Sequence, residues 1–135
     1  MKPFNVHILA ADHTFYDGEC VSLIVPTVTG MYGIHAGHSN MISAIVPGML
    51  SYQLEGEEMQ IAAISPGIMK IENGEVLVLV DSIERPEEID VNRAKREADA
   101  AQEAILQKRS MKEYRLAQAT LSRELNRLKV KNSMR

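Results

Sequence analysis

The stretch from Ile68 to Val80, IMKIENGEVLVLV, decides the fold of the first part of this chain. Two runs rich in Ile, Val and Leu flank Asn73-Gly74, a dipeptide that supplies the two positive φ angles of a type I′ turn. The spacing therefore predicts a β-hairpin with strands over 68–72 and 76–80. The unbroken Val/Leu run at 76–80 also predicts a strand that is covered on both faces.

Short apolar segments separated by turn residues precede this hairpin. Phe4, Val6 and Ile8 alternate with polar residues, as expected of a strand with one buried face. Further candidate strands span residues 21–25, 41–46, 49–54 and 59–64. The segment 55–58, EGEE, joins the last two as a hairpin loop. Strands of this length and spacing predict an antiparallel β-sandwich or barrel.

Glycine and proline divide the chain into two parts. All eight glycines lie at or before Gly74, and all five prolines lie at or before Pro86. Because these residues break helices, their absence from the rest of the chain favours helices there. We therefore expect a two-part α+β chain, with a β-sandwich domain over residues 1–86 and a helical domain over residues 87–135. The charged segment 84–88, ERPEE, joins them.

The second part is predicted to form an antiparallel two-helix hairpin. Asp90 occupies an N-cap position, and residues 110–113, SMKE, fit a capping box that starts a second helix near Met111. The apolar stripe of the first helix is Val91, Ala94, Ala98, Ala101 and Ile105. The stripe of the second helix is Tyr114, Ala117, Leu121, Leu125 and Leu128. Two helices joined by so short a connection usually pack antiparallel.

The net charge of -3 hides a strongly dipolar chain. Residues 1–107 contain six Lys or Arg and sixteen Asp or Glu, a net charge of -10. Residues 108–135 contain nine Lys or Arg and two Glu, a net charge of +7. These cations are spaced singly among Leu, Ala and Gln, with Tyr114 as the only aromatic residue. The pattern favours a solvated or acid-facing helix over a nucleic-acid interface.

The sequence carries no motif of the common catalytic sites. A phosphate loop, a nucleophile elbow and a His-Glu-x-x-His zinc motif are all missing. Cys20, the single cysteine, falls in an expected strand and is interpreted as a buried structural thiol. His35 and His38 lie three residues apart, but no nearby carboxylate or cysteine completes a metal site, so turn or interface histidines are preferred. With no apolar run of ~18 residues and no signal peptide, we expect a cytosolic chain.

Three arginines form the most specific constellation. An antiparallel hairpin folded about residues 109–110 brings Arg93 beside Arg127, with Arg123 one turn away on the same face. Asp90 is the nearest acid expected, and one carboxylate cannot neutralise three guanidinium groups. One interpretation is a phosphorylated ligand bound at this helix N-terminus. The other is that Asp90 only caps the helix while the arginines extend into water, and the spacing leaves both open.

Five short segments, in this order, resemble those of a known family. They are FYDG at 15–18, GIHAGH at 33–38, IVPG at 45–48, ISPG at 64–67 and IDVNRA at 89–94. With a β-rich head before a two-helix tail, the chain resembles the epsilon subunit of bacterial F-type ATP synthases over essentially its full length.

The resemblance implies a central-stalk rotor subunit with no catalytic residue and no metal site. In this family the β-sandwich binds the gamma subunit and rests on the membrane rotor ring of c subunits. Gly37, His38 and Ser39 match the loop that faces this ring. The C-terminal helices oppose ATP hydrolysis when they extend toward the catalytic alpha and beta subunits, and release it when folded. The implied location is peripheral, at the cytoplasmic face of the cell membrane, without membrane insertion or a nucleic-acid partner.

Residues 89–94 match the Ile/Leu-Asp-x-x-Arg-Ala motif of members that bind ATP and hold the hairpin folded. The resemblance thereby implies no required cofactor but a regulatory ATP site formed by Glu84, Ile89, Asp90, Arg93, Ala94, Arg123 and Arg127. Ala100 stands where such members commonly carry an arginine, although Arg96 lies one turn earlier. Pro66 replaces a glycine of the family and removes a backbone donor.

Two other functions compete with this one. The first is a free-standing β-sandwich adaptor whose basic helical hairpin docks on an acidic protein partner. Co-purification distinguishes the two, because a rotor subunit should come down with gamma. The second is a small hydrolase or metal enzyme that uses His35, His38 and Asp81, which metal analysis tests.

Overall fold

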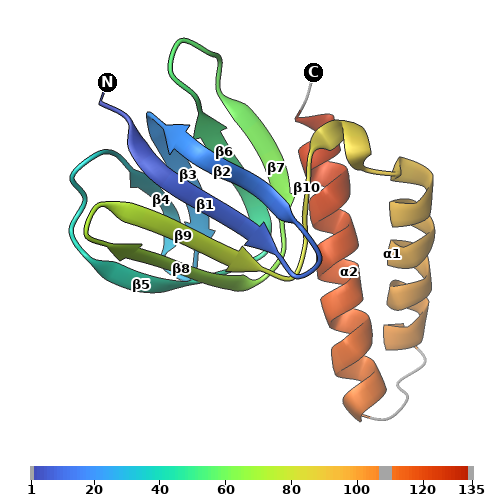
Figure 1. Ribbon diagram of the computed structural model, residues 1–135. Helices are drawn as coiled ribbons and strands as arrows, with labels where there is room; N and C mark the ends of the chain where they lie inside the picture. Colours follow the sequence, from blue (N-terminus) through green and yellow to red (C-terminus); the bar gives the residue numbers. More distant parts are fainter. Residues whose placement is uncertain (1, 107–110, 134–135) are drawn as a thin grey trace. The chain divides into compact units, whose positions relative to one another are not determined.

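The computed structural model describes residues 2–106 and 111–133, with the side chains of 106 and 111–114 left out. The chain divides into two compact units, Met1–Glu84 and Arg85–Arg135. The first unit is built from strands and the second from helices (Figure 1). The expected fold class, a β-sandwich followed by a packed helix pair, is confirmed.

One continuous hydrogen-bonded sheet forms the first unit. Its order is β10-β7-β6-β3-β5-β8-β9-β1-β2, with β4 paired to β3. Neighbouring strands are antiparallel except for β1 and β9, which are parallel. The strands are β1 Phe4–Ala10, β2 Thr14–Cys20, β3 Ser22–Thr27, β4 Gly30–Ile34, β5 Met41–Ile45, β6 Gly48–Gln53, β7 Gln60–Ile64, β8 Gly67–Glu72, β9 Glu75–Val80 and β10 Ile83–Glu84.

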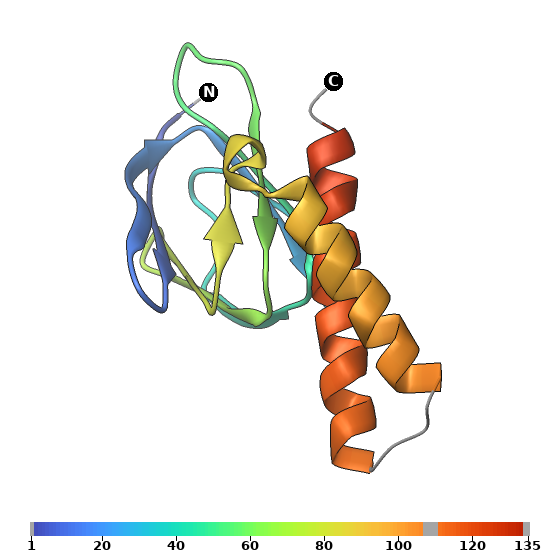
Figure 2. The same cartoon turned by 90° about the vertical axis from the view of Figure 1, so that its right-hand side faces the viewer.

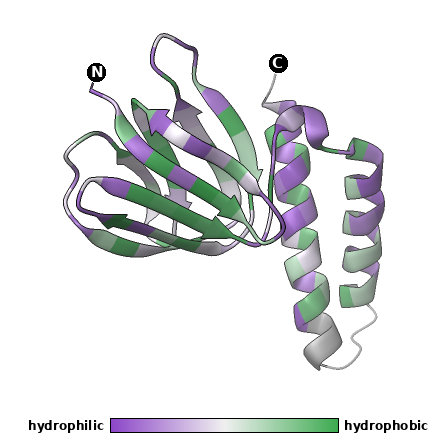
Figure 3. Cartoon of the chain, in the orientation of Figure 1, coloured by the Kyte–Doolittle hydropathy of each residue, from purple (hydrophilic) through white to green (hydrophobic). Residues whose placement is uncertain are grey.

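The sheet folds over into two layers that enclose the core. β3 and β5 pair only at Thr27 and Ile45, which marks the corner between the layers. An edge-to-face contact of Phe15 with Tyr52, with ring centroids 5.8 Å apart, links β2 to β6. Strand side chains alternate between hydrophobic and hydrophilic, most clearly along β1 (Figure 3). The fully buried side chains of this core include Val6, Ile8, Leu23, Val25, Ile34, Leu50, Met69 and Val78.

The hairpin of β8 and β9 forms as predicted, but one face of β9 is open. Asn73 and Gly74 have φ angles of 52° and 80°, as a type I′ turn requires. The prediction of a strand covered on both faces is wrong, because Leu79 is 38% exposed while Val78 is fully buried. The side chain of Leu79 therefore lies on the outer face of this layer and is partly exposed.

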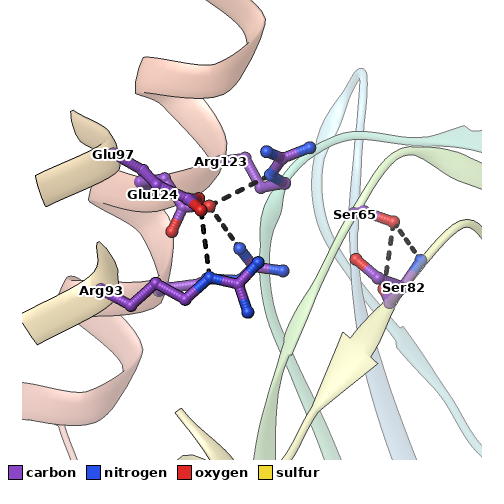
Figure 4. Close-up of polar contacts among 7 residues, drawn as sticks. Ser65, Ser82, Arg93, Glu97, Arg123 and Glu124 are labelled. Atoms are coloured by element: carbon purple, nitrogen blue, oxygen red, sulfur yellow. Dashed lines mark hydrogen bonds and ion pairs between the residues drawn. The ribbon is translucent and has the colours of Figure 1, made fainter. Parts of the chain in front are cut away.

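The turn between β7 and β8 accommodates Pro66, which stands where the family usually has glycine. The Ser65 hydroxyl donates to the Ser82 carbonyl oxygen (3.0 Å) and accepts from the Ser82 N–H (2.7 Å), as Figure 4 shows. These bonds hold the turn without a donor from residue 66. A Cβ on Gly67 would lie 2.0 Å from the Leu79 carbonyl oxygen, so only glycine fits where β8 meets β9.

The second unit contains the short 3-10 helix η1 Pro86–Glu88, then α1 Val91–Leu106 and α2 Met111–Asn132. The two long helices pack side by side (Figure 2). Asp90 caps α1 as predicted, because its Oδ1 accepts from the Arg93 N–H at 3.0 Å. Ala94, Ala98 and Ala101 are buried, which confirms the centre of the predicted stripe. Of the helices in the described residues, none is both long and apolar enough to span a membrane.

The apolar stripe predicted for α2 is wrong at its centre. Leu125 is 51% exposed, whereas Glu124 is only 1% exposed. Ala117 is buried as expected, and Leu121 and Leu128 are half-buried. The capping box predicted at 110–113 and the side chain of Tyr114 lie outside the described residues. The buried Glu124 forms ion pairs with Arg123 and Arg127 of its own helix.

Candidate functional site

The loop between β4 and β5 carries Gly37, His38 and Ser39. Gly37 has a φ of 79°, which favours glycine. The Nδ1 of His38 donates to the Ser39 carbonyl oxygen at 2.8 Å, and its Nε2 accepts from the Tyr32 hydroxyl at 2.9 Å. His38 is thus a turn histidine with both ring nitrogens engaged, and Ser39 is exposed beside it.

No metal centre emerges from the histidines. His35 is exposed in the same loop, and Asp81 lies in the turn after β9. Within residues 2–106 and 111–133, no three His, Cys, Asp or Glu side chains are grouped so that they could hold a metal ion. Cys20 is fully buried, and burial raises the pKa of its thiol to about 11. The interpretation of Cys20 as a buried structural thiol is therefore confirmed.

The N-terminus of α1 positions four of the seven residues expected at the ATP site. The backbone N–H of buried Ile89 donates to the Pro86 carbonyl oxygen at 3.2 Å, which closes η1. Asp90 then caps α1, Arg93 follows within the first turn, and Ala94 faces the buried side of the helix. Glu84 ends β10 and belongs to the first unit.

The three arginines meet acids that the sequence analysis did not name. The Nε of Arg93 donates to Glu97 Oε1 at 3.0 Å. The Nε of Arg123 donates to Glu124 Oε1 at 3.2 Å, and Arg127 Nη1 donates to the same oxygen. Figure 4 shows Glu97 and Glu124 next to each other, with dashed lines that join Arg93 and Arg123 to these two acids. The prediction that Asp90 is the nearest acid is therefore wrong.

The two glutamates have opposite electrostatic environments. Burial raises the pKa of Glu124, and a hydrogen bond with Glu97 adds to this effect against the attraction of Arg127 and Arg123. The hydrogen bond from Arg93 lowers the pKa of Glu97, and the contact with Glu124 acts in the same direction. Arg93 in turn has its pKa raised by Glu97. We call Arg93, Glu97, Arg123, Glu124 and Arg127 the arginine–glutamate cluster.

Spacing alone offered a signal for both glutamates. Arg93 and Glu97 are four residues apart, and Glu124 and Arg127 are three apart, which are the distances at which helical side chains meet. What spacing could not reveal is that Glu124 faces inward, because a glutamate normally belongs to the solvent side of a helix.

Small residues leave a groove next to this cluster. The groove has a volume of about 400 Å³, and Glu97 and Thr120 are among its lining residues. The residues that line it include Ala100, Ala101, Ala104 and Ala117. Ala100 stands where ATP-binding members of the family commonly carry an arginine. Here it lines the groove and contributes no charge to it.

Comparisons with known proteins agree on one family. The family described as "ATP synthase, Delta/Epsilon chain, beta-sandwich domain" matches residues 3–86, and "ATP synthase, Delta/Epsilon chain, long alpha-helix domain" matches residues 87–132. The ATP synthase epsilon chain of Ruminococcus albus is 36% identical over 133 residues, which covers 98% of both chains. That of Caldanaerobacter subterraneus subsp. tengcongensis is 37% identical over 130 residues, covering 96% of this chain and 94% of the relative.

Solved structures show a similar fold. A chain in the cryo-EM structure of the Euglena gracilis mitochondrial ATP synthase, OSCP/F1/c-ring, matches with a TM-score of 0.81 at 18% identity. The match covers 98% of this chain and 82% of that one. A chain of the Tetrahymena thermophila mitochondrial ATP synthase central stalk/c-ring matches with a TM-score of 0.65 at 12% identity, covering 94% and 95%.

Proposed function

Because this chain belongs to the ATP synthase delta/epsilon chain family, we propose that it is the epsilon subunit of an F-type ATP synthase. It is a non-catalytic subunit of the central stalk that couples the catalytic head to the membrane rotor ring. The observation that carries this proposal is that two adjoining family matches run from residue 3 to residue 132. The subunit is peripheral at the cytoplasmic face of the cell membrane, and its Gly37, His38 and Ser39 loop contacts the c subunits.

An apolar row on the outer face of the sandwich supports docking on the gamma subunit. Ile68 of β8 pairs with Ala44 of β5 on one side and with Leu79 of β9 on the other, and Leu79 pairs with Leu9 of β1. Paired residues share a face, so these four side chains form a row across the layer. Ile68 is 49% exposed and Leu79 is 38% exposed. A continuous exposed apolar surface of this kind is typical of a protein–protein interface.

Co-purification with gamma tests this assignment. Tagged wild-type chain should capture the gamma subunit in stoichiometric amount, whereas Ile68→Asp combined with Leu79→Asp should lose it, because two carboxylates would be buried unpaired. Met59→Asp places one such carboxylate at another apolar residue, 43% exposed in the β6–β7 loop, and should retain gamma. Failure of the wild-type chain to capture gamma would instead favour a free-standing adaptor.

The helical unit supplies the regulatory part of the proposal. The hairpin opposes ATP hydrolysis when it extends toward the alpha and beta subunits, and it relieves this inhibition when folded. Regulatory ATP binds the folded hairpin through Ile89, Asp90, Arg93, Ala94, Arg123 and Arg127, with Glu84 included on the sequence resemblance. A ligand shifts such a two-state equilibrium only through its different affinities for the two states. The convergence of three arginines from both helices in the folded hairpin supports this role.

A further inference from the structure

Glu124 is the most deeply buried charged side chain among the described residues, with 1% exposure. It lies within α2, between Arg123 and Arg127, and its Oε1 accepts hydrogen bonds from both guanidinium groups. The Arg127 side chain is itself only 20% exposed. A buried carboxylate is costly unless cations neutralise it, and here two cations do so. The arginines in turn have their donors directed at a protein carboxylate.

The facing helix supplies a second carboxyl. Glu97 of α1 accepts from Arg93 at 3.0 Å and lies beside Glu124, as Figure 4 shows, so that it raises the pKa of the Glu124 carboxyl. Burial and the neighbouring Glu97 raise the pKa of Glu124, while Arg127 and Arg123 act in the opposite direction and hold its carboxylate by ion pairs. Glu97 of α1 thus engages Arg93, and Glu124 of α2 engages Arg123 and Arg127, so the two carboxyl groups together occupy donors of all three arginines.

Phosphate oxygens require the same donors. Guanidinium groups bind carboxylate and phosphate with similar geometry, so the two anions compete for Arg93, Arg123 and Arg127. We propose that Glu124, together with Glu97, is a built-in competitor that occupies the arginine cluster in the folded hairpin and must be displaced by a phosphate-bearing ligand. This inference rests on the regulatory nucleotide site proposed above and names the residues that set its affinity. The folded hairpin accordingly closes without bound nucleotide.

Calorimetric titration of ATP into the isolated full-length chain at pH 8 and low salt tests this role. Glu124→Gln keeps the size of the side chain but removes its charge, so ATP should bind at least tenfold more tightly than to the wild-type chain. Tripolyphosphate, titrated in parallel, should show the same gain because the competition concerns phosphate. Glu103→Gln, an exposed site on α1, makes the same change in net charge and should leave both affinities within twofold.

Circular dichroism checks that each variant keeps its helices, and Glu97→Gln provides the decisive comparison if Glu124→Gln does not fold. Equal or weaker binding by the folded glutamate variants overturns the competitor role while leaving the nucleotide site in place. Arg93→Ala combined with Arg127→Ala tests the site itself and should abolish binding. If this double variant binds like the wild type, or no variant binds ATP, the nucleotide site is wrong and the competitor role falls with it.

Discussion

At the scale of single residues, Glu124 and Cys20 show how burial changes chemistry. Both are almost completely inaccessible, at 1% and 0% exposure. Glu124 is tolerated because guanidinium groups surround it, while Cys20 is tolerated because a thiol is neutral at ordinary pH. Glu124 therefore couples α1 to α2, whereas Cys20 contributes an uncharged side chain to the core of the sandwich.

The pKa of Cys20 predicts a specific dependence of stability on pH. Burial raises this pKa from 9.0 to about 11, so the folded chain retains a proton that the unfolded chain loses above pH 9. Because the folded state then binds more protons, the free energy of unfolding should fall as pH rises, by up to roughly 1.4 kcal/mol per pH unit between about 9 and 11.

Urea unfolding at pH 8 and pH 10 measures this effect. Lysines and tyrosines also titrate in that range, so the comparison is with Cys20→Ala, which lacks the thiol. The wild-type chain should lose more stability than this variant between the two pH values. Parallel losses in the two chains would show that the thiol ionises as readily in the folded state as in the unfolded state.

Single residues were predictable where local chemistry decides their role. The Asp90 cap follows from a carboxylate placed before an apolar helical stripe, and the Asn73-Gly74 turn follows from backbone sterics. Glu124 was not predictable as a buried residue, because its place depends on Glu97 of the other helix and on two arginines acting together. Only the packed helix pair brings these groups into contact.

At the scale of elements, the spacing of apolar residues and the positions of turn residues predicted most strands and both long helices. β2 and β4 were missed because Asp17-Gly18 in β2 and the two glycines of GMYGI in β4 are typical of turns. β10 was missed because it has only two residues, Ile83 and Glu84. β10 exists through pairing with the distant β7, which no local pattern records, whereas β4 forms a hairpin with the adjacent β3 across residues 28–29.

The cap of α1 gives a prediction at this scale. Asp90→Ala removes the side-chain acceptor for the Arg93 N–H and should destabilise the first turn by about 1 kcal/mol. Hydrogen exchange at the Ala94 amide, which bonds the Asp90 carbonyl oxygen at 3.0 Å, should then become about fivefold faster. Asp99→Ala, an exposed site within α1, is the matched control and should not accelerate it. The same protection in both variants would rule out a capping role for Asp90.

At the scale of the whole molecule, the two units differ in charge and in the forces that hold them. The sandwich unit is closed by a continuous hydrophobic core, whereas the helix pair relies on small buried alanines and on the arginine–glutamate cluster. The Lys131 ammonium also donates to the Pro86 carbonyl oxygen at 2.9 Å, which ties the end of α2 to the start of this unit. Polar ties of this kind stabilise only modestly, which is compatible with the opening of the hairpin that we propose.

The central claim is that this helical unit brakes ATP hydrolysis in an ATP synthase. The most direct measurement compares ATP hydrolysis by the assembled complex containing the full-length chain with hydrolysis by a complex whose chain ends at Glu87. A chain shortened only by residues 133–135 serves as the control for truncation itself. We predict faster hydrolysis with the chain ending at Glu87 and an unchanged rate with the control. Equal rates in all three complexes would contradict the account.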